Sequence, residues 1–152
     1  ANGIQPLSCG SFLQNEKTYE TDPNKGRLYL RYTKAEPRFW LSLHNQKFDR
    51  VRWSVMEFGR YYEAKLSEAF LEAIGNSDEK IPRVIDVGGN IGWFSMLSVA
   101  AGAHVYTFEP NKMNHFRACE TVCLNNWDEE PCPTLGYLAT SNATHPAGKV
   151  DI

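Results

Sequence analysis

The stretch that most constrains the fold is Arg83–Pro110, RVIDVGGNIGWFSMLSVAAGAHVYTFEP, because one unbroken run predicts a strand, a turn, a helix and a second strand. The first strand is the apolar, β-branched segment 84–87, which we expect to be buried on both faces, as parallel strands are. The second strand is expected at 105–108. Alternation of this kind predicts an α/β protein with neighbouring parallel strands.

Three glycines, Gly88, Gly89 and Gly92, form the turn between the first strand and the helix. Glycine adopts positive φ angles readily and lets a ligand approach the backbone without meeting a Cβ atom. The helix is expected over residues 91–100, and Gly102 is expected to stop it. The glycine turn therefore lies at a helix N-terminus.

Two acidic residues flank this turn in the predicted fold. Asp86 interrupts an otherwise apolar strand, and a charged residue in such a strand indicates a structural or functional role. Glu109 follows the second strand at its carboxyl end, the edge where open α/β sheets bind ligands. A carboxylate in that place can accept hydrogen bonds from both hydroxyls of a ribose, so these residues predict a nucleotide-like cofactor site.

The glycine spacing argues against a dinucleotide. The dinucleotide fingerprint is G-x-G-x-x-G, which lays a pyrophosphate on bare backbone and is followed by an acid roughly 20 residues later. Glu109 would suit that fingerprint, but Asn90 occupies its second glycine position, and its third falls at the aromatic pair Trp93-Phe94 rather than at a glycine. An NAD-dependent oxidoreductase is therefore disfavoured.

The pattern D-x-G-x-N-x-G resembles motif I of class I S-adenosylmethionine (SAM) methyltransferases, and V-I-D-V-G-G-N-I-G-W-F-S followed by F-E-P-N is similar to the FkbM-type family. The resemblance implies a Rossmann-like class I methyltransferase sheet with SAM as cofactor. It implies that Asp86 contacts the methionine end of SAM and that Glu109 holds the ribose diol. The turn that would surround the cofactor is formed by Gly88, Gly89, Asn90 and Gly92.

The same resemblance implies O-methyl transfer to a sugar or similar hydroxyl, and hence a small-molecule or glycan acceptor. The segments F-W-L-S-L-H, K-F-D-x-x-R-W and G-R-Y-Y-E are similar to the region before motif I in some eukaryotic members. That similarity implies that Tyr62 and Glu63 line the cofactor pocket. The alternative is a core tyrosine beside a solvent-exposed glutamate. No general base can be named, so the catalytic residues stay unassigned.

The chain divides into an irregular N-terminal arm at 1–26, a hairpin and helix at 27–81, and a partial SAM-binding core at 82–152. The hairpin strands are expected at 27–32 and 39–43, where apolar and polar residues alternate.

A long helix is expected from about Trp53 to Ile74, because apolar residues recur there at every fourth position. Gly59 predicts a break in it, and Gly75 with Asn76 predicts its end. We expect the apolar side of this helix to pack on the sheet.

Class I methyltransferases resemble one another in a sheet of strand order 3-2-1-4-5-7-6, and this chain offers strands 1 to 3 only. The third strand is expected at 134–139, after a helix at 112–125, and residues 149–152 predict a further hairpin strand. The strand at 84–87 would then have one unpaired edge, which is a template for association. We expect either that the polypeptide continues past Ile152 or that a protein partner covers this edge.

The second case gives an alternative function, a non-catalytic accessory subunit of a larger organellar assembly, photosynthetic or respiratory.

The 152 residues suit one domain with a sizeable core. A net charge of −2 gives no electrostatic case for nucleic acid. The longest apolar stretch, residues 93–103, is too short to cross a bilayer.

The four cysteines are Cys9, Cys119, Cys123 and Cys132. They show no C-x-x-C spacing and no histidine at ligand spacing, so zinc is not expected and buried thiols are favoured. A disulfide between Cys123 and Cys132 would need an oxidising compartment. Together with the sequon at 142–144 and the absence of an initiator methionine, this leaves a processed eukaryotic organellar or secretory-lumen protein as a hypothesis.

Overall fold

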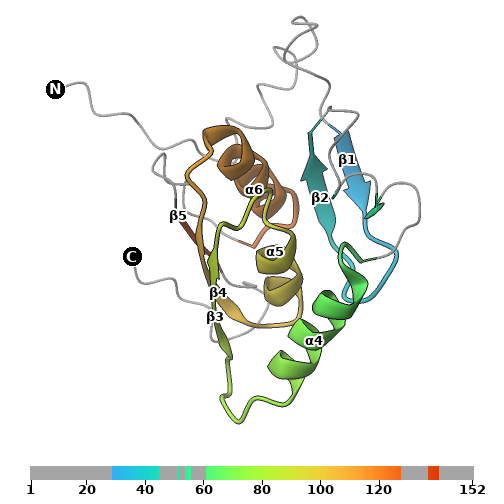
Figure 1. The fold of residues 1–152 in the computed structure, drawn as a ribbon, viewed down its shortest axis with the longest axis vertical. Coiled ribbons are helices and arrows are strands. Elements are labelled where there is room, and N and C mark those ends of the chain that lie inside the picture. Colours follow the sequence, from blue (N-terminus) through green and yellow to red (C-terminus); the bar gives the residue numbers. More distant parts are fainter. Residues whose placement is uncertain (1–28, 45–50, 52–53, 56–60, 128–136, 141–152) are drawn as a thin grey trace, which may run out of the picture.

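The computed structural model describes residues 29–44, 51, 54–55, 61–127 and 137–140. Within them the chain is a small α/β protein with alternating strands and helices, as predicted (Figure 1). The elements are β1 (Tyr29–Tyr32), β2 (Trp40–Leu43), α4 (Ala64–Gly75), β3 (Arg83–Val87), α5 (Trp93–Ala100), β4 (His104–Phe108), α6 (Lys112–Leu124) and β5 (Tyr137–Thr140). The predicted arm at 1–26 and the predicted strand at 149–152 lie outside the described residues.

The main sheet has the order β3-β4-β5. β3 and β4 are parallel, with Arg83 opposite His104 and Val87 opposite Phe108. The β-α-β unit predicted from the sequence is therefore confirmed. The third strand lies beside β4, as expected, but it runs antiparallel to β4. It covers Tyr137–Thr140 rather than 134–139, and residues 134–136 are not described.

The predicted hairpin is confirmed as the antiparallel pair β1-β2, with Tyr29 opposite Leu43 and Tyr32 opposite Trp40. It forms a separate two-stranded sheet on the far side of α5 and α6 from the main sheet (Figure 1). The side chain of Asn125 fixes β2 to the end of α6, because it accepts a hydrogen bond from the Trp40 amide at 2.8 Å and donates one to the Trp40 carbonyl at 2.8 Å.

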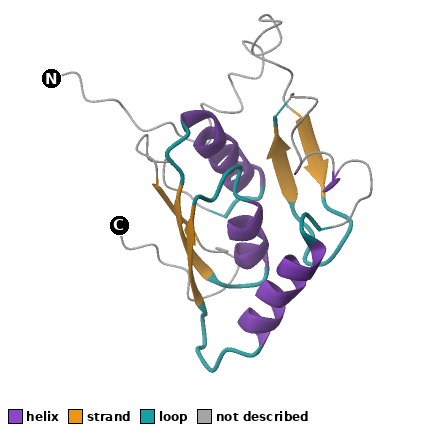
Figure 2. Cartoon of the chain, viewed as in Figure 1, coloured by secondary structure: helices purple, strands orange, loops and turns teal. Residues whose placement is uncertain are grey.

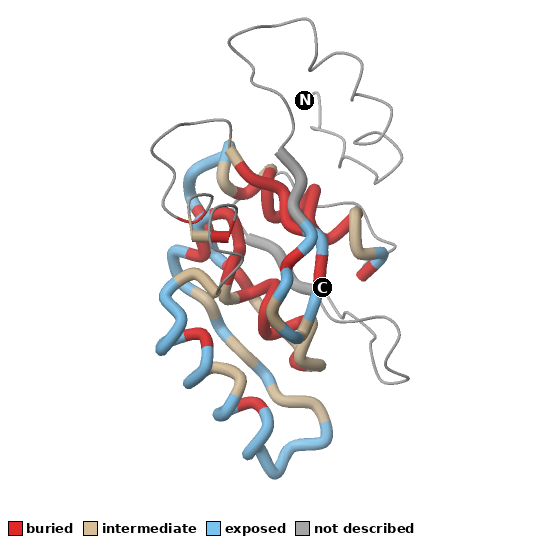
Figure 3. Tube along the Cα trace, turned by 90° about the vertical axis from the view of Figure 1, so that its right-hand side faces the viewer, coloured by how far each residue is buried: buried red, intermediate tan, exposed pale blue. Residues whose placement is uncertain are grey.

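The helical segment before the core is interrupted, as predicted, because residues 54–55 are helical and residues 61–63 are not, whereas Gly59 itself lies outside the described residues. Its packing differs from the prediction. α4 begins at Ala64, after a turn in which Glu63 has a left-handed φ of 46°, so no helix spans residues 61–63. It packs on α5 rather than mainly on the sheet. Phe70 stacks on Phe94 of α5 at 5.0 Å, and Ser67 accepts a hydrogen bond from the Trp93 indole at 2.9 Å. Most of α4 is exposed (Figure 3).

The prediction that β3 is buried on both faces is wrong. α5 and α6 lie on one side of the main sheet (Figure 2). Residues that face them, such as Val105 and Thr107, are buried. On the opposite side Ile85 is 69% exposed and Val87 is 80% exposed. A continuous apolar run cannot show whether one or both faces will be covered, because that depends on elements elsewhere in the chain.

The expectation of buried free thiols is also wrong for the described cysteines. Cys119 and Cys123 both lie in the buried part of α6, and both are disulfide-bonded. Cys9 and Cys132 lie outside the described residues. Among the helices described here, none is long and apolar enough to cross a membrane.

Candidate functional site

The glycine turn is fixed to the carboxyl ends of both parallel strands. The amides of Gly88 and Gly89 donate hydrogen bonds to the Phe108 carbonyl at 2.8 and 3.3 Å. The chain then bends through left-handed conformations, with φ of 82° at Gly88, 54° at Asn90 and 88° at Gly92. This geometry brings the turn next to Glu109, as predicted.

The three glycines serve different purposes. A Cβ atom at Gly89 would lie 2.3 Å from Thr107 Cγ2, and one at Gly92 would lie 3.2 Å from Ala118 Cβ. The protein's own packing therefore excludes a side chain at Gly89, whereas at Gly92 a Cβ atom would make tight contacts with Met96 and Ala118. A Cβ atom at Gly88 would meet no other atom of the described residues within 4 Å. Of the three, Gly88 is the position that leaves open space at the turn.

Asp86 has a hydrogen-bonding reason to interrupt β3. Its Oδ2 accepts a hydrogen bond from the hydroxyl of Ser95 at 2.5 Å, and the hydroxyls of Ser95 and Thr107 are 2.6 Å apart. The chain of three side chains joins β3, α5 and β4 beneath the turn. Sequence reasoning missed Ser95 and Thr107. Ser95 stood inside the quoted motif, but nothing in the local pattern indicated the role of Thr107.

Glu109 joins the two loops at this edge of the sheet. One carboxylate oxygen accepts the Asn90 amide at 2.8 Å, and the other accepts the Asn111 amide at 2.7 Å. The residue is 6% exposed. A carboxylate has about four lone-pair sites, so two amide bonds leave capacity for two hydroxyl donors.

The Asn111 side chain caps α6, because its Oδ1 accepts hydrogen bonds from the amides of Met113 at 3.0 Å and Asn114 at 3.5 Å. The Asn111 cap and the Glu109 carboxylate together hold the start of α6 next to the glycine turn.

Glu63, the other predicted cofactor residue, is placed differently. It is exposed at the start of α4, and its carbonyl accepts the Ser67 amide at 3.0 Å. Tyr62 is half-buried and its ring lies 6.3 Å from that of Phe94. No hydrogen bond or ion pair within the described residues joins Glu63 to the turn, so its role there remains a prediction.

A second polar cluster, which we call the hairpin cluster, lies between β2 and α6 and contains Ser42, Arg117, Glu120 and Thr121. Glu120 accepts hydrogen bonds from Arg117 at 2.7 Å and Ser42 Oγ at 2.6 Å. Arg117 is 3% exposed and Glu120 is 6% exposed. Burial raises the pKa of the Glu120 carboxyl, although Arg117 and Ser42 partly offset that effect. Sequence reasoning did not find this cluster, whose members lie up to 79 residues apart.

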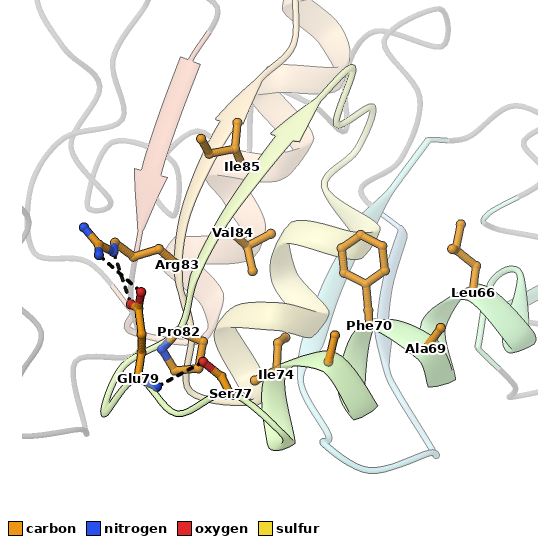
Figure 4. Close-up of a pocket in the computed structure, with 11 residues that line it drawn as sticks. Leu66, Ala69, Phe70, Ile74, Ser77, Glu79, Pro82, Arg83, Val84 and Ile85 are labelled. Carbon is orange, nitrogen blue, oxygen red and sulfur yellow. Dashed lines mark hydrogen bonds and ion pairs between the residues drawn. The ribbon is translucent and has the colours of Figure 1, made fainter.

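A cavity of about 530 Å³ lies between α4 and the edge of β3 (Figure 4), away from the glycine turn. Its walls are largely apolar. Among the described residues no group of three or more histidine, cysteine or acidic side chains is placed to hold a metal ion.

No protein-family model matches this sequence, and neither a curated protein nor a solved structure matches the chain. The class of this protein is therefore described from its own fold and from the geometry of the glycine turn. It is a small α/β protein in which a glycine turn and two carboxylates meet at the carboxyl ends of two parallel strands.

Proposed function

We propose that this chain is the cofactor-binding part of a SAM-dependent methyltransferase of the FkbM type. The observation that carries the proposal is the position of Glu109. Its carboxylate is held at the carboxyl end of β4 by the Asn90 amide of the glycine turn and the Asn111 amide of the next loop. This is the edge of a parallel sheet at which nucleotide-like ligands bind.

The residues at the turn fit SAM better than a dinucleotide. A carboxylate with remaining acceptor capacity suits a ribose diol. The open space at Gly88 lets a ligand approach the backbone, whereas Gly89 faces Thr107 and Gly92 faces Met96 and Ala118. Gly88, Asn90 and Glu109 would hold the nucleoside side of SAM, and Asp86 would hold its methionine end.

When bound, SAM supplies an electrophilic methyl group for direct transfer. The chain's own contribution at this site is to bind and orient the cofactor, and orientation alone supplies a large share of catalysis in such transfers. The finer fold proposed here is part of a Rossmann-like class I methyltransferase sheet. The proposed acceptor is a sugar or a similar hydroxyl.

Calorimetric titration of the chain with SAM tests the proposal. We expect saturable binding that Glu109→Ala weakens about tenfold or more, because a hydrogen bond to a charged group contributes about 1.5 to 3 kcal/mol. Glu109→Gln keeps one carbonyl acceptor for the loop amides, so it should weaken binding while preserving the turn better than Glu109→Ala. Absence of SAM binding by the unaltered chain would refute the proposal.

The matched control is Glu72→Ala, which removes an exposed glutamate on α4. Its SAM affinity should equal that of the unaltered chain. Unfolding midpoints of all variants separate a loss of cofactor contacts from a loss of structure.

A second candidate is a non-catalytic accessory subunit that has the turn but acts through a protein partner. The exposure of Ile85 and Val87 on the sheet favours it, since large exposed apolar patches mark interaction sites. Analytical ultracentrifugation of the purified chain tests this candidate. A soluble monomer that unfolds cooperatively without any partner would argue against it.

The disulfide bonding of Cys119 and Cys123 supports the secretory-lumen hypothesis for location, because disulfides persist in oxidising compartments. Alkylation of the denatured, unreduced protein should leave both cysteines unmodified, and alkylation after reduction should modify both. Labelling of either cysteine in the denatured, unreduced protein would contradict this assignment.

A further inference from the structure

Two cysteines lie one turn apart in the buried part of α6. Cys119 is 2% exposed and Cys123 is 7% exposed, and both are disulfide-bonded. The helix that carries them is continuous from Lys112 to Leu124. The partner of each sulfur must therefore be compatible with a position inside a regular helix.

The geometry of the helix excludes a bond between these two cysteines. Residues four apart in an α-helix have Cβ atoms about 5 to 6 Å apart. A disulfide needs Cβ atoms about 3.5 to 4.5 Å apart. The Cys119 sulfur also lies 3.6 Å from His115 Nε2, one turn earlier in α6, which directs it away from Cys123. Each cysteine is therefore bonded to a residue outside α6.

The composition of the chain leaves two partners. The sequence contains four cysteines, and the other two are Cys9 and Cys132. Two bonds that start on α6 and use these two residues account for all four sulfurs. A cysteine of another molecule fits less well, because it would have to reach the sulfur of a residue that is only 2% exposed in the single chain.

The end of α6 indicates which partner belongs to which cysteine. The Asn126 amide donates to the Cys123 carbonyl and the Trp127 amide to the Val122 carbonyl, both at 3.2 Å. Asn126 has a left-handed φ of 53°, so the chain turns away from the helix beside Cys123. Cys132 follows soon after this turn, and Cys119 lies about 6 Å further along the helix axis. Cys123 is therefore the nearer partner for Cys132.

We propose that α6 carries two disulfides within the chain, Cys123–Cys132 and Cys9–Cys119. The first closes residues 123–132 into a short loop directly after the helix. The second joins the predicted N-terminal arm to α6. The helix is thereby the covalent anchor of the arm and of the segment that leads to β5. The proposal names the partners of the two bonded cysteines and does not rest on SAM binding.

The sequence allows all four cysteines to be separated by two proteases. Cleavage after lysine, arginine and glutamate gives the peptides 1–16, 118–120, 121–129 and 130–149, each with one cysteine. The full chain is denatured without reductant, alkylated to block any free thiol, and digested. Mass spectrometry before and after reduction then identifies which peptides are joined.

We expect peptide 1–16 joined to 118–120, peptide 121–129 joined to 130–149, and no alkylated cysteine. Joining of 118–120 to 121–129 would show a bond within α6 and would overturn the proposal. Joining of 1–16 to 121–129 would overturn the assigned pairing. A cross-linked dimer that disappears on reduction would overturn it in favour of a bond between two copies.

Serine variants test the two bonds separately. Cys9→Ser should release one thiol, on peptide 118–120, and Cys132→Ser should release one thiol, on peptide 121–129. Ser8→Ala is the matched control, because it changes the neighbour of Cys9 without removing a sulfur, and it should release none. The peptide map of the unaltered chain needs no variant, so it decides the pairing even where a variant fails to fold.

Unfolding midpoints rank the two bonds. In the chain-entropy description, a disulfide stabilises a protein more when it closes a longer loop. Cys9→Ser should therefore lower the midpoint by roughly 10 °C or more, and Cys132→Ser should lower it by less. Equal midpoints for Cys9→Ser and the unaltered chain would contradict the anchoring of the arm to α6.

These outcomes are separable from the methyltransferase proposal. The peptide map reports on the sulfurs of α6, and SAM titration reports on the glycine turn. Either result can fail while the other holds.

Discussion

Two polar clusters in this protein hold carboxylates in different ways. At the turn, Asp86 and Glu109 accept hydrogen bonds from neutral donors, a hydroxyl and two backbone amides. In the hairpin cluster, Glu120 is paired with the guanidinium of Arg117, and both side chains are almost completely buried. Neutral partners orient a carboxylate without supplying a counter-ion, which fits the ligand-binding role proposed for the turn. A buried counter-ion neutralises the carboxylate and makes the site part of the framework.

The largest expected effect comes from breaking the ion pair. Glu120→Ala should lower the free energy of unfolding by about 3 to 5 kcal/mol, because it leaves Arg117 charged and buried. Denaturant unfolding measures this change. Glu72→Ala, at an exposed position on α4, is the control and should change stability little.

A double variant sharpens the same point. Arg117→Met with Glu120→Leu removes both charges and should be clearly more stable than Glu120→Ala, because no buried charge is left unpaired. If the double variant were as unstable as Glu120→Ala, the unpaired charge of Arg117 would not explain the loss of stability in Glu120→Ala.

The next largest effect concerns the closeness of packing beneath the turn. Gly89→Ala should cost about 1 to 3 kcal/mol, because the new methyl group would meet Thr107 Cγ2 at 2.3 Å. Adding Thr107→Ser removes that methyl group and should recover part of the loss while keeping the hydroxyl. Thermal unfolding measures the series. Gly75→Ala is the matched control, since a Cβ there would meet nothing within 4 Å.

A smaller effect is expected from the hydroxyl chain. Ser95→Ala should cost about 1 kcal/mol in stability and weaken SAM binding several-fold, because it removes the donor that orients Asp86. Ser98→Ala is the control. Its hydroxyl bonds the Phe94 carbonyl on the same helix, so it should affect stability but not SAM affinity. Equal SAM affinity of the two variants would contradict a positioning role for Ser95.

The smallest effect is a pH dependence of stability that arises from Glu120. Its pKa is raised in the folded protein by burial, so the folded state binds more protons than the unfolded state above the ordinary carboxyl pKa. Stability contributed by this group should therefore fall as pH rises from that ordinary value through the raised one. Glu120→Gln should remove this slope in urea unfolding at a series of pH values. An unchanged slope would assign the pH dependence to other groups.

The local elements were predictable because their signals are local. The glycines and the apolar periodicity between Arg83 and Phe108 placed β3, α5 and β4 to within about two residues. The hairpin and α6 followed from alternation and from Asn111 at the helix start. The position of Glu109 beside the turn followed from parallel strands ending at one edge.

The candidate site was predictable only in part. Asp86 and Glu109 stood out because each is a charge next to an apolar strand. Ser95 and Thr107 did not, because their partners come from three different elements. The hairpin cluster was missed for the same reason, since Ser42 and Glu120 are 78 residues apart. The disulfide bonding of Cys119 and Cys123 was not predicted, because buried thiols were favoured over the disulfide that an oxidising compartment would allow.

The sequence alone therefore determined the β-α-β unit, its glycine turn and the two carboxylates at its edge, because backbone preference and periodicity act over a few residues. Tertiary structure decided which face of β3 is covered, where α4 packs and which charges are buried together. Burial and pairing depend on which distant elements meet. A strand pattern shows that a surface is apolar, but only its neighbours show whether that surface is core or a place for a partner.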